Sequence, residues 1–240
     1  DRAGRLLRLI VPEGALVYTT LMGIIIVALF GAMIMQGGAE MLWPGTSEAM
    51  KRQILISLNL GASHVGYFDL GRLCHDLRIE GMSNLCPEYP HVHRLVTSMF
   101  VHFGLMHFLF NIYALLQLGP LLEQVYGRSK FLVLYFLCGV GGSAVSIWWH
   151  WDNPSGAHAG ASGALFGLIG ASLVYGWRTG GAFGRSLASE MLRWGVFALI
   201  FSLIVKADNA AHLGGAAVGA GLAFVLPDQT KPSKIHPNVW

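Results

Sequence analysis

Charged side chains are scarce in this chain. Only 12% of its 240 residues are Asp, Glu, Lys or Arg, whereas a soluble globular domain usually has about 25%. Hydrophobic residues make up 54% of the chain, and there are 31 glycines. This combination is typical of helices that pack closely within a bilayer. The scarcity of charge argues against an ordinary soluble domain and predicts a polytopic helical membrane protein.

The chain also lacks a basic stripe, a tandem repeat and a low-complexity tract. Its formal net charge is only +3, and its Lys and Arg residues lie mainly in connectors, so we expect no nucleic-acid binding. Cysteine is scarce, with three in the chain. Cys138 lies in an apolar stretch, where packing explains it. Cys74 and Cys86 share one polar loop and could form a disulfide if that loop faces an oxidising compartment.

Six apolar stretches approach the roughly 20 residues that a helix needs to cross a bilayer. They cover about 15–36, 96–119, 130–149, 157–176, 186–205 and 209–226. The fifth is the weakest, because Glu190 and Arg193 precede a short apolar part. We therefore expect an all-α bundle of six transmembrane helices. It would form a single membrane domain over residues 1–240, with a core at 94–226 and a long first extramembrane loop at about 37–95.

The distribution of Lys and Arg predicts the orientation of these spans. If the N-terminus is cytoplasmic, the cytoplasmic segments hold most of these residues, and the short outer connectors hold only Lys206. Both termini are then cytoplasmic, and the second, fourth and sixth spans run from the outside inwards. Because the chain begins at Asp1 and not at Met, we also expect a trimmed N-terminus.

A serine and a histidine open two of the spans that run in the same direction. Ser162 lies in Gly-Ala-Ser-Gly about five residues into the fourth span, and His212 lies about three residues into the sixth. Nucleophilic and ionisable groups are costly in hydrocarbon and indicate function there. A neutral imidazole can take the proton of a serine hydroxyl during attack and return it to the leaving group. The pair predicts a serine hydrolase built inside the membrane.

Small residues predict that these two spans touch. Glycines recur four residues apart on each span, as Gly163 with Gly167 and Gly215 with Gly219. This spacing lets helix backbones approach closely. Phe166 is four residues after Ser162, so its ring could stack on His212 or could simply pack there.

The second span carries a third polar set. It has no charged residue between Leu95 and Leu122, yet it contains His102, His107 and Asn111. His107 and Asn111 are four residues apart and share one helix face. They could donate hydrogen bonds to a developing oxyanion, or they could satisfy each other in a structural network. His102 lies off that face, so we expect a structural role for it.

No carboxylate stands at the depth that a third catalytic member would need. Asp208 is four residues before His212 and could orient its ring, but it lies at the end of the span, where an interfacial position is expected. The sequence therefore favours a Ser-His dyad.

Taken together, these motifs resemble the rhomboid family of intramembrane serine proteases. The resemblance rests on Gly-x-Ser-Gly at 160–163, Ala-His-x-x-Gly-x-x-x-Gly at 211–219 and the His-x-x-x-x-His-x-x-x-Asn pattern at 102–111, and it covers about 94–226. Glu123 and Gly127 fit the connector that follows the second span in this family. Two positions depart from the family pattern. His93 precedes Arg94 where Trp is common, and Phe166 stands where bacterial relatives often have Tyr.

The resemblance implies an endopeptidase that cleaves a transmembrane protein substrate in or near its membrane segment, through an acyl-enzyme and without a metal or cofactor. Ser162 would be the nucleophile and His212 the general base, with Phe166, Gly160, Gly163, Gly215, Gly219 and His102 in support. The side chains of His107 and Asn111 and the backbone N–H of Ser162 would form the oxyanion hole. The site would open to the outside, with the fifth helix and the following loop gating it. The protein would be a multi-pass protein of a bacterial inner membrane.

Three other readings are open. A catalytically inactive rhomboid relative would bind membrane clients, but such relatives typically lack the serine or the histidine. A six-helix transporter would be expected to show inverted repeats around a midplane site, and no such symmetry is visible. A metal protease of the His-Glu-x-x-His type requires a glutamate beside the first histidine, and Phe108 follows His107.

Overall fold

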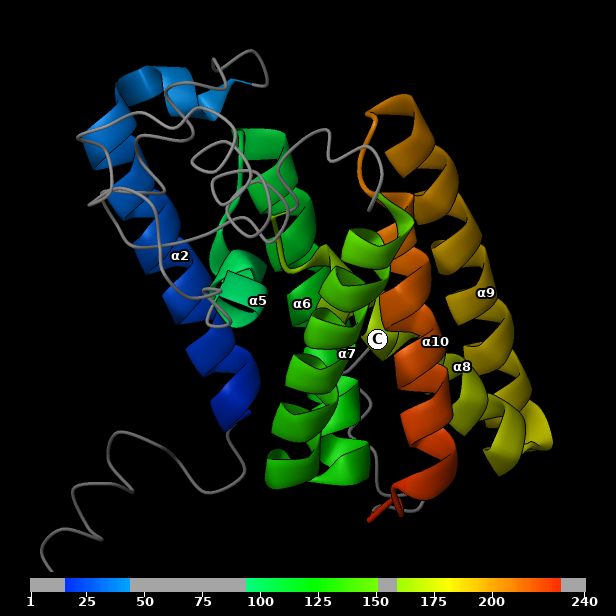
Figure 1. Cartoon of the computed structure of the whole chain (residues 1–240). Coiled ribbons are helices and arrows are strands. Elements are labelled where there is room, and N and C mark those ends of the chain that lie inside the picture. The colour runs from blue at the N-terminus through cyan, green and yellow to red at the C-terminus, as the bar shows by residue number, and fades with distance from the viewer. Residues whose placement is uncertain (1–15, 44–93, 151–158, 230–240) are drawn as a thin grey trace, which may run out of the picture.

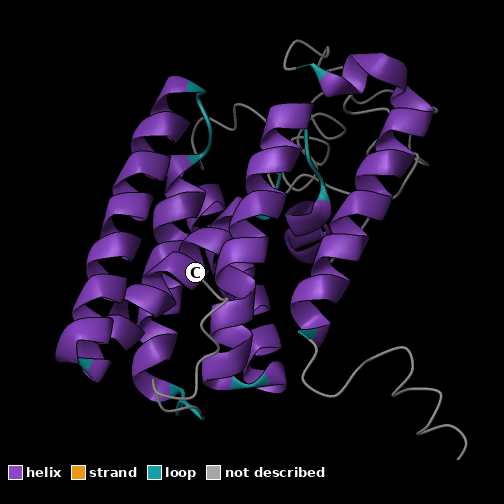
Figure 2. Ribbon diagram, turned by 180° about the vertical axis from the view of Figure 1, so that it is seen from behind, coloured by secondary structure: helices purple, strands orange, loops and turns teal. Residues whose placement is uncertain are grey.

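The computed structural model describes residues 16–43, 94–150 and 159–229. Every described element is helical (Figure 2), which confirms the all-α fold. The six long helices are α2 (Val17–Gly37), α6 (Leu105–Tyr126), α7 (Arg128–Trp149), α8 (Ser162–Thr179), α9 (Gly181–Ile204) and α10 (Asn209–Val225). The short elements are η1 (Gly38–Leu42), α5 (Arg94–Thr97) and η4 (Ser98–Phe100).

The long helices alternate in direction. In Figure 1, α6, α8 and α10 begin towards the upper end of the bundle, and α2, α7 and α9 begin at the lower end. Four described stretches are long and apolar enough to cross a membrane, namely α2 with η1, α6, α7 and α9, while α10 is apolar but shorter. The arrangement is that of a multi-pass bundle.

Helix α8 is the central helix of the described bundle. It contacts α6, α7, α9 and α10, and its side chains are buried along almost its whole length. Glycine, alanine and serine are frequent in it because its faces meet other helices, and small residues permit that approach.

The contact between α8 and α10 is the most extensive of any pair of described helices. A Cβ atom on Gly215 would overlap the carbonyl oxygen of Gly163, and one on Gly219 would overlap that of Gly167. The contact predicted from the paired glycines is therefore confirmed, and it is made backbone to backbone.

Three of the expected spans begin elsewhere than predicted. The second is interrupted after Phe100, and α6 begins only after Gly104, so His102 lies outside the helix. The fourth begins at Ser162 and not five residues before it. The fifth was predicted to be weak, yet α9 has 24 residues and is the longest described helix. Its buried residues are few, however: Gly184, Leu187, Met191 and Ser202.

Glu123 holds the first described helix to the second span. It lies in the last turns of α6, which runs on to Tyr126, so it belongs to the helix and not to the connector. Its buried carboxylate accepts hydrogen bonds from the backbone N–H groups of Tyr18 and Thr19 (3.0 and 2.9 Å) and from the Thr19 hydroxyl (2.8 Å). A carboxylate at a helix N-terminus satisfies donors that have no partner within the helix.

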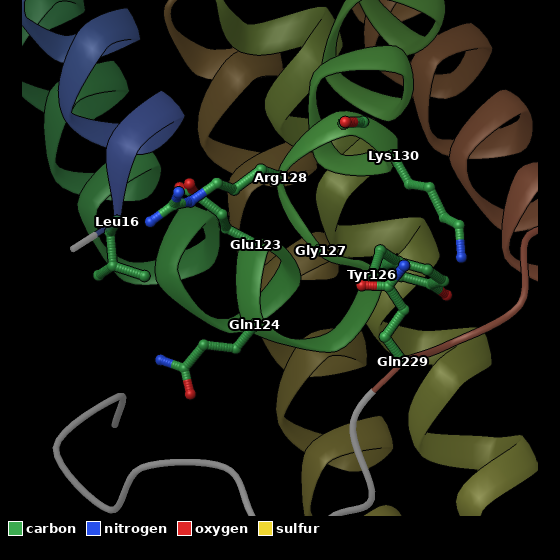
Figure 3. Close-up of a pocket in the computed structure, with 9 residues that line it drawn as sticks. Leu16, Glu123, Gln124, Tyr126, Gly127, Arg128, Lys130 and Gln229 are labelled. Atoms are coloured by element: carbon green, nitrogen blue, oxygen red, sulfur yellow. The ribbon is translucent and has the colours of Figure 1, made fainter. Parts of the chain in front are cut away.

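A cavity of about 430 Å³ lies at this corner between α6 and α7. Gly127 makes the corner with φ = 78°, a conformation that favours glycine. In Figure 3, Arg128 and Glu123 lie together beside Leu16, and Lys130 points away from them. Lys130 Nζ donates to the carbonyl of Pro227 (2.7 Å). The cavity is lined by neither Ser162 nor His212.

Cys138 is buried in α7, as expected from its apolar surroundings. Cys74 and Cys86 lie outside the described residues, as does most of the long first loop. Their pairing stays a prediction.

Candidate active site

Three helices that run in the same direction bring their first turns together. Ser162 is the first residue of α8, His212 is the fourth of α10, and His107 is the third of α6. The N-terminal end of a helix carries partial positive charge and unpaired N–H donors. The place where these ends meet is therefore suited to developing negative charge.

Ser162 and His212 are in direct contact. The Oγ of Ser162 lies 2.9 Å from the Nε2 of His212, which is within hydrogen-bond reach. Ser162 is half-buried, whereas His212 is 4% exposed. The two residues, 50 positions apart in sequence, have the geometry of a nucleophile and its base.

Phe166 holds one face of the His212 ring. The ring centroids are 4.3 Å apart and the planes are inclined by 14°, so the rings are stacked. Because Phe166 follows Ser162 by one helical turn, the same face of α8 presents both the hydroxyl and the ring that packs on the imidazole.

The residues before Ser162 form a tight bend that requires glycine at position 160. Gly160 has φ = 117°, and a Cβ atom there would lie 2.5 Å from the Nε2 of His107. The Gly160 N–H donates to the carbonyl of Ser98 (2.8 Å). The bend is thus pressed against the ring of His107 and fixed to η4.

His102 supports the same bend from within the core. It is fully buried, its Nδ1 lies 3.3 Å from the carbonyl of Phe100, and its Nε2 lies 3.3 Å from the backbone N of Ala161. The two contacts fit a neutral ring that donates through Nδ1 and accepts through Nε2. Both contacts are to backbone atoms, and the structural role expected for His102 stays a prediction.

Asn111 lies one turn along α6 from His107 and is 4% exposed. Its Nδ2 donates to the His107 carbonyl (2.8 Å). Since an amide nitrogen carries two hydrogens, one remains for another acceptor. The two residues share one face of α6, as their spacing predicts.

The backbone N–H of Ser162 has no partner within its own helix. The first hydrogen bond of α8 runs from the N–H of Leu165 to the carbonyl of Ala161 (3.0 Å). The N–H groups of the preceding turn therefore point out of the helix end. This group belongs to the same residue as the nucleophilic hydroxyl.

Two side chains near the site have contacts that sequence reasoning missed. Asp208 was expected to be interfacial, but its side chain caps α10 by accepting from the N–H of Ala211 (3.1 Å). It also accepts from the hydroxyl of Ser146, which is fully buried in α7. An Asp immediately before the helix was a signal for the cap. Nothing in the sequence indicated the partner 62 positions away.

The sequence matches the Rhomboid domain family over residues 89–229. This match covers more than half of the chain and includes all three helix starts of the site. The chain therefore belongs to the rhomboid family, and it is an integral, multi-pass membrane protein.

Curated relatives agree with this assignment. The chain is 36% identical over 137 residues to the rhomboid protease GluP of Bacillus subtilis, a match that covers 56% of this chain and 26% of the relative. It is 37% identical over 137 residues to RHOMBOID-like protein 1 of Arabidopsis thaliana (56% and 34%). It is 28% identical over 159 residues to the rhomboid protease AarA of Providencia stuartii (55% and 56%). The aligned region thus spans about a quarter to just over half of these relatives.

Proposed function

We propose that the protein is an intramembrane serine endopeptidase that cleaves transmembrane protein substrates. The observation that carries the proposal is the 2.9 Å contact between Ser162 Oγ and His212 Nε2 at the meeting point of three helix N-termini. Membership of a family whose named members include proteases supports it.

In this proposal Ser162 and His212 act as a dyad. Ser162 Oγ attacks the substrate carbonyl carbon as its proton passes to His212 Nε2. The tetrahedral intermediate collapses, the C–N bond breaks, and His212 returns the proton to the leaving amine. Water then attacks the acyl-enzyme by the same proton transfers, which releases the second product and restores the Ser162 hydroxyl.

The negative oxygen of the intermediate would be stabilised by the Ser162 N–H and by the side chains of His107 and Asn111. The contact of His107 with Gly160 supports its assignment, because it brings the ring beside the bend that precedes Ser162. Preorganised donors of this kind are worth up to several kcal/mol each when water is excluded.

The proposed orientation places the site near the outer face of a bacterial inner membrane, with both termini cytoplasmic. Of the described basic residues, Arg128, Lys130, Arg178 and Arg185 lie at helix ends opposite to the starts of α6, α8 and α10, whereas Lys206 lies just before the start of α10. That distribution supports the orientation, since cytoplasmic segments are enriched in Lys and Arg.

Cleavage of a reporter transmembrane substrate by the purified protein in liposomes tests the proposal, with Ser162→Ala and His212→Ala as controls. We expect cleavage and fluorophosphonate labelling by the parent, and a loss of cleavage of at least about 10³-fold in each variant. Cleavage retained by Ser162→Ala would refute the assignment. A parent that neither cleaves any of several substrates nor takes the label would favour an inactive, client-binding relative.

A further inference from the structure

The first turn of α10 is held differently from the starts of the other long helices. The first turn of α2 is capped by Glu123 of another helix, and of the six long helices described only α10 has an N-cap residue whose own side chain accepts a hydrogen bond from the helix. That side chain is Asp208, and its own carbonyl accepts the N–H of His212 (3.2 Å). The capped turn is therefore the one that carries the proposed base.

Helix α7 fixes this turn from one side at two points one helical turn apart. Ser146 donates its hydroxyl to the second carboxylate oxygen of Asp208. Gly142 lets the backbone approach, since a Cβ atom there would lie 2.7 Å from the carbonyl oxygen of Ala211. The hydrogen bond and the close contact together fix the position of α10 along α7 and its rotation about its own axis.

Helix α9 contacts the same turn through Asn209, the residue that follows Asp208. The hydroxyl of Ser202, which is 4% exposed, donates to the side-chain oxygen of Asn209 (2.5 Å). Two consecutive residues thus connect one helical turn to the helices on either side of it. The His212 ring is in turn confined between Phe166 and Ser162.

We propose that Asp208 is a positioning residue for His212, acting through the Ala211 N–H and the Ser146 hydroxyl. This inference rests on the proposed function. Asp208 sets the backbone from which the imidazole reaches Ser162, while Phe166 sets the plane of the ring. Proton transfer needs the 2.9 Å contact, and misplacement of a reacting group by about 1 Å can cost about 10²-fold in rate.

The chain offers a matched control for the Ser146 contact. Ser143 lies on the same helix, is fully buried like Ser146, and its hydroxyl has no hydrogen-bond partner in the described residues. Ser146→Ala and Ser143→Ala thus remove the same atom from similar surroundings. Only the first removes a donor to Asp208.

The test measures three quantities in Ser146→Ala, Ser143→Ala, Asp208→Ala, Asp208→Asn and the double variant of Ser146→Ala with Asp208→Ala. They are the rate at which fluorophosphonate labels Ser162, kcat and KM on a reporter substrate, and hydrogen exchange of the segment 207–214. We expect Ser146→Ala to lower the labelling rate and kcat roughly ten-fold with KM unchanged, and to speed exchange in this segment. Ser143→Ala should match the parent.

Two comparisons separate positioning from simple stabilisation. Asn is also a good N-cap and can donate to the Ser146 oxygen, so Asp208→Asn should regain most of the rate that Asp208→Ala loses. The double variant should be no slower than Asp208→Ala, because both changes break one contact. A Ser146→Ala protein with a lowered unfolding temperature but the parent's labelling rate, measured well below unfolding, would overturn the positioning role.

The exchange measurement distinguishes failure of this inference from failure of the proposed function. A parent that is neither labelled nor active overturns the proposed function. Exchange in 207–214 that is the same in Ser146→Ala and Ser143→Ala overturns the inference, whatever the activity of the parent.

Discussion

Two helix pairs flank the candidate site, and their contacts are made by different kinds of residue. Between α8 and α10, glycines bring the two backbones into contact and leave no room for a side chain. Between α6 and α9, aromatic rings bridge the gap. Phe110 lies 5.0 Å from Phe201, and Tyr113 lies stacked 5.7 Å from Trp194, measured between ring centroids.

The difference indicates which side of the bundle can change shape. A backbone contact cannot shift without losing the relation between Ser162 and His212. Rings with several rotamers can turn aside at small cost, and α9 has few buried residues to hold it. Under the proposed function, the rigid pair would suit the chemistry, and the ring-lined pair would suit the admission of a substrate from the membrane.

The largest effect is expected from Gly215→Val. Its side chain would meet the carbonyl of Gly163, which is backbone and cannot turn aside, so stability should fall by about 3 kcal/mol or more and activity should be lost. Thermal unfolding in detergent and the reporter assay measure both. Gly221→Val on the same helix is the control, because a Cβ atom at Gly221 meets nothing within 4 Å. Equal stability in the two variants would contradict the claim that the contact between α8 and α10 leaves no room for a side chain.

Asn111→Ala tests whether α6, one helix of the ring-lined pair, contributes to the proposed chemistry. We expect kcat to fall by roughly 10²-fold, about 3 kcal/mol of barrier, with a smaller change in KM, because an oxyanion donor acts mainly in the transition state. Steady-state kinetics on the reporter measures the split. An unchanged kcat would make Asn111 a packing residue.

Phe166→Leu tests the stack on His212 within the rigid pair. Leucine keeps the apolar volume but not the aromatic face, so we expect a three- to ten-fold loss of labelling rate, as for an aromatic contact worth about 0.5–1.5 kcal/mol. Phe166→Tyr keeps the ring and should label at nearly the parent rate. Similar losses in both variants would show that the stack is not the cause, because Tyr keeps the aromatic face that Leu lacks.

The smallest effect on stability is expected from Phe201→Ala in the ring-lined pair. We expect unfolding to change by less than about 1 kcal/mol, while cleavage of the transmembrane reporter changes and labelling by the small fluorophosphonate does not. Trp177→Ala is the matched control, since Trp177 pairs with Phe224 across α8 and α10 (6.2 Å). Equal effects of both variants on reporter cleavage would contradict a specific role of the α6–α9 pair in substrate admission.

Hydropathy predicted the number of long helices but not where three of them begin. The break before α6 involves Val101 and His102 and ends at Gly104 with φ = 86°, and apolarity gives no information on backbone dihedrals. The start of α9 was missed because Arg185 and Glu190 lower the local hydropathy. These residues lie on the first turns of the helix, where water or headgroups are within reach.

The positions of Ser162 and His212 were predictable because their motifs fix residue type and spacing, and paired glycines indicated the helix contact. The contacts of Asp208 and Glu123 were not predictable. Each joins side chains or turns far apart in sequence, 62 positions for Ser146 and Asp208 and 104 for Thr19 and Glu123. A single sequence carries no signal for such long-range pairings. A helix cap, by contrast, can be recognised from the residue types at the start of the helix.

The carboxylate of Glu123 has a consequence for the order of assembly. The donors that it accepts from belong to the start of the first described helix, but Glu123 itself is made about a hundred residues later. As the chain is synthesised and inserted, α2 enters the membrane before its partner exists, with water or lipid headgroups serving its first turn. The part of α2 docking that depends on this carboxylate therefore waits for α6, and a newly made chain cut short before Glu123 would lack the hydrogen bonds that hold the start of α2.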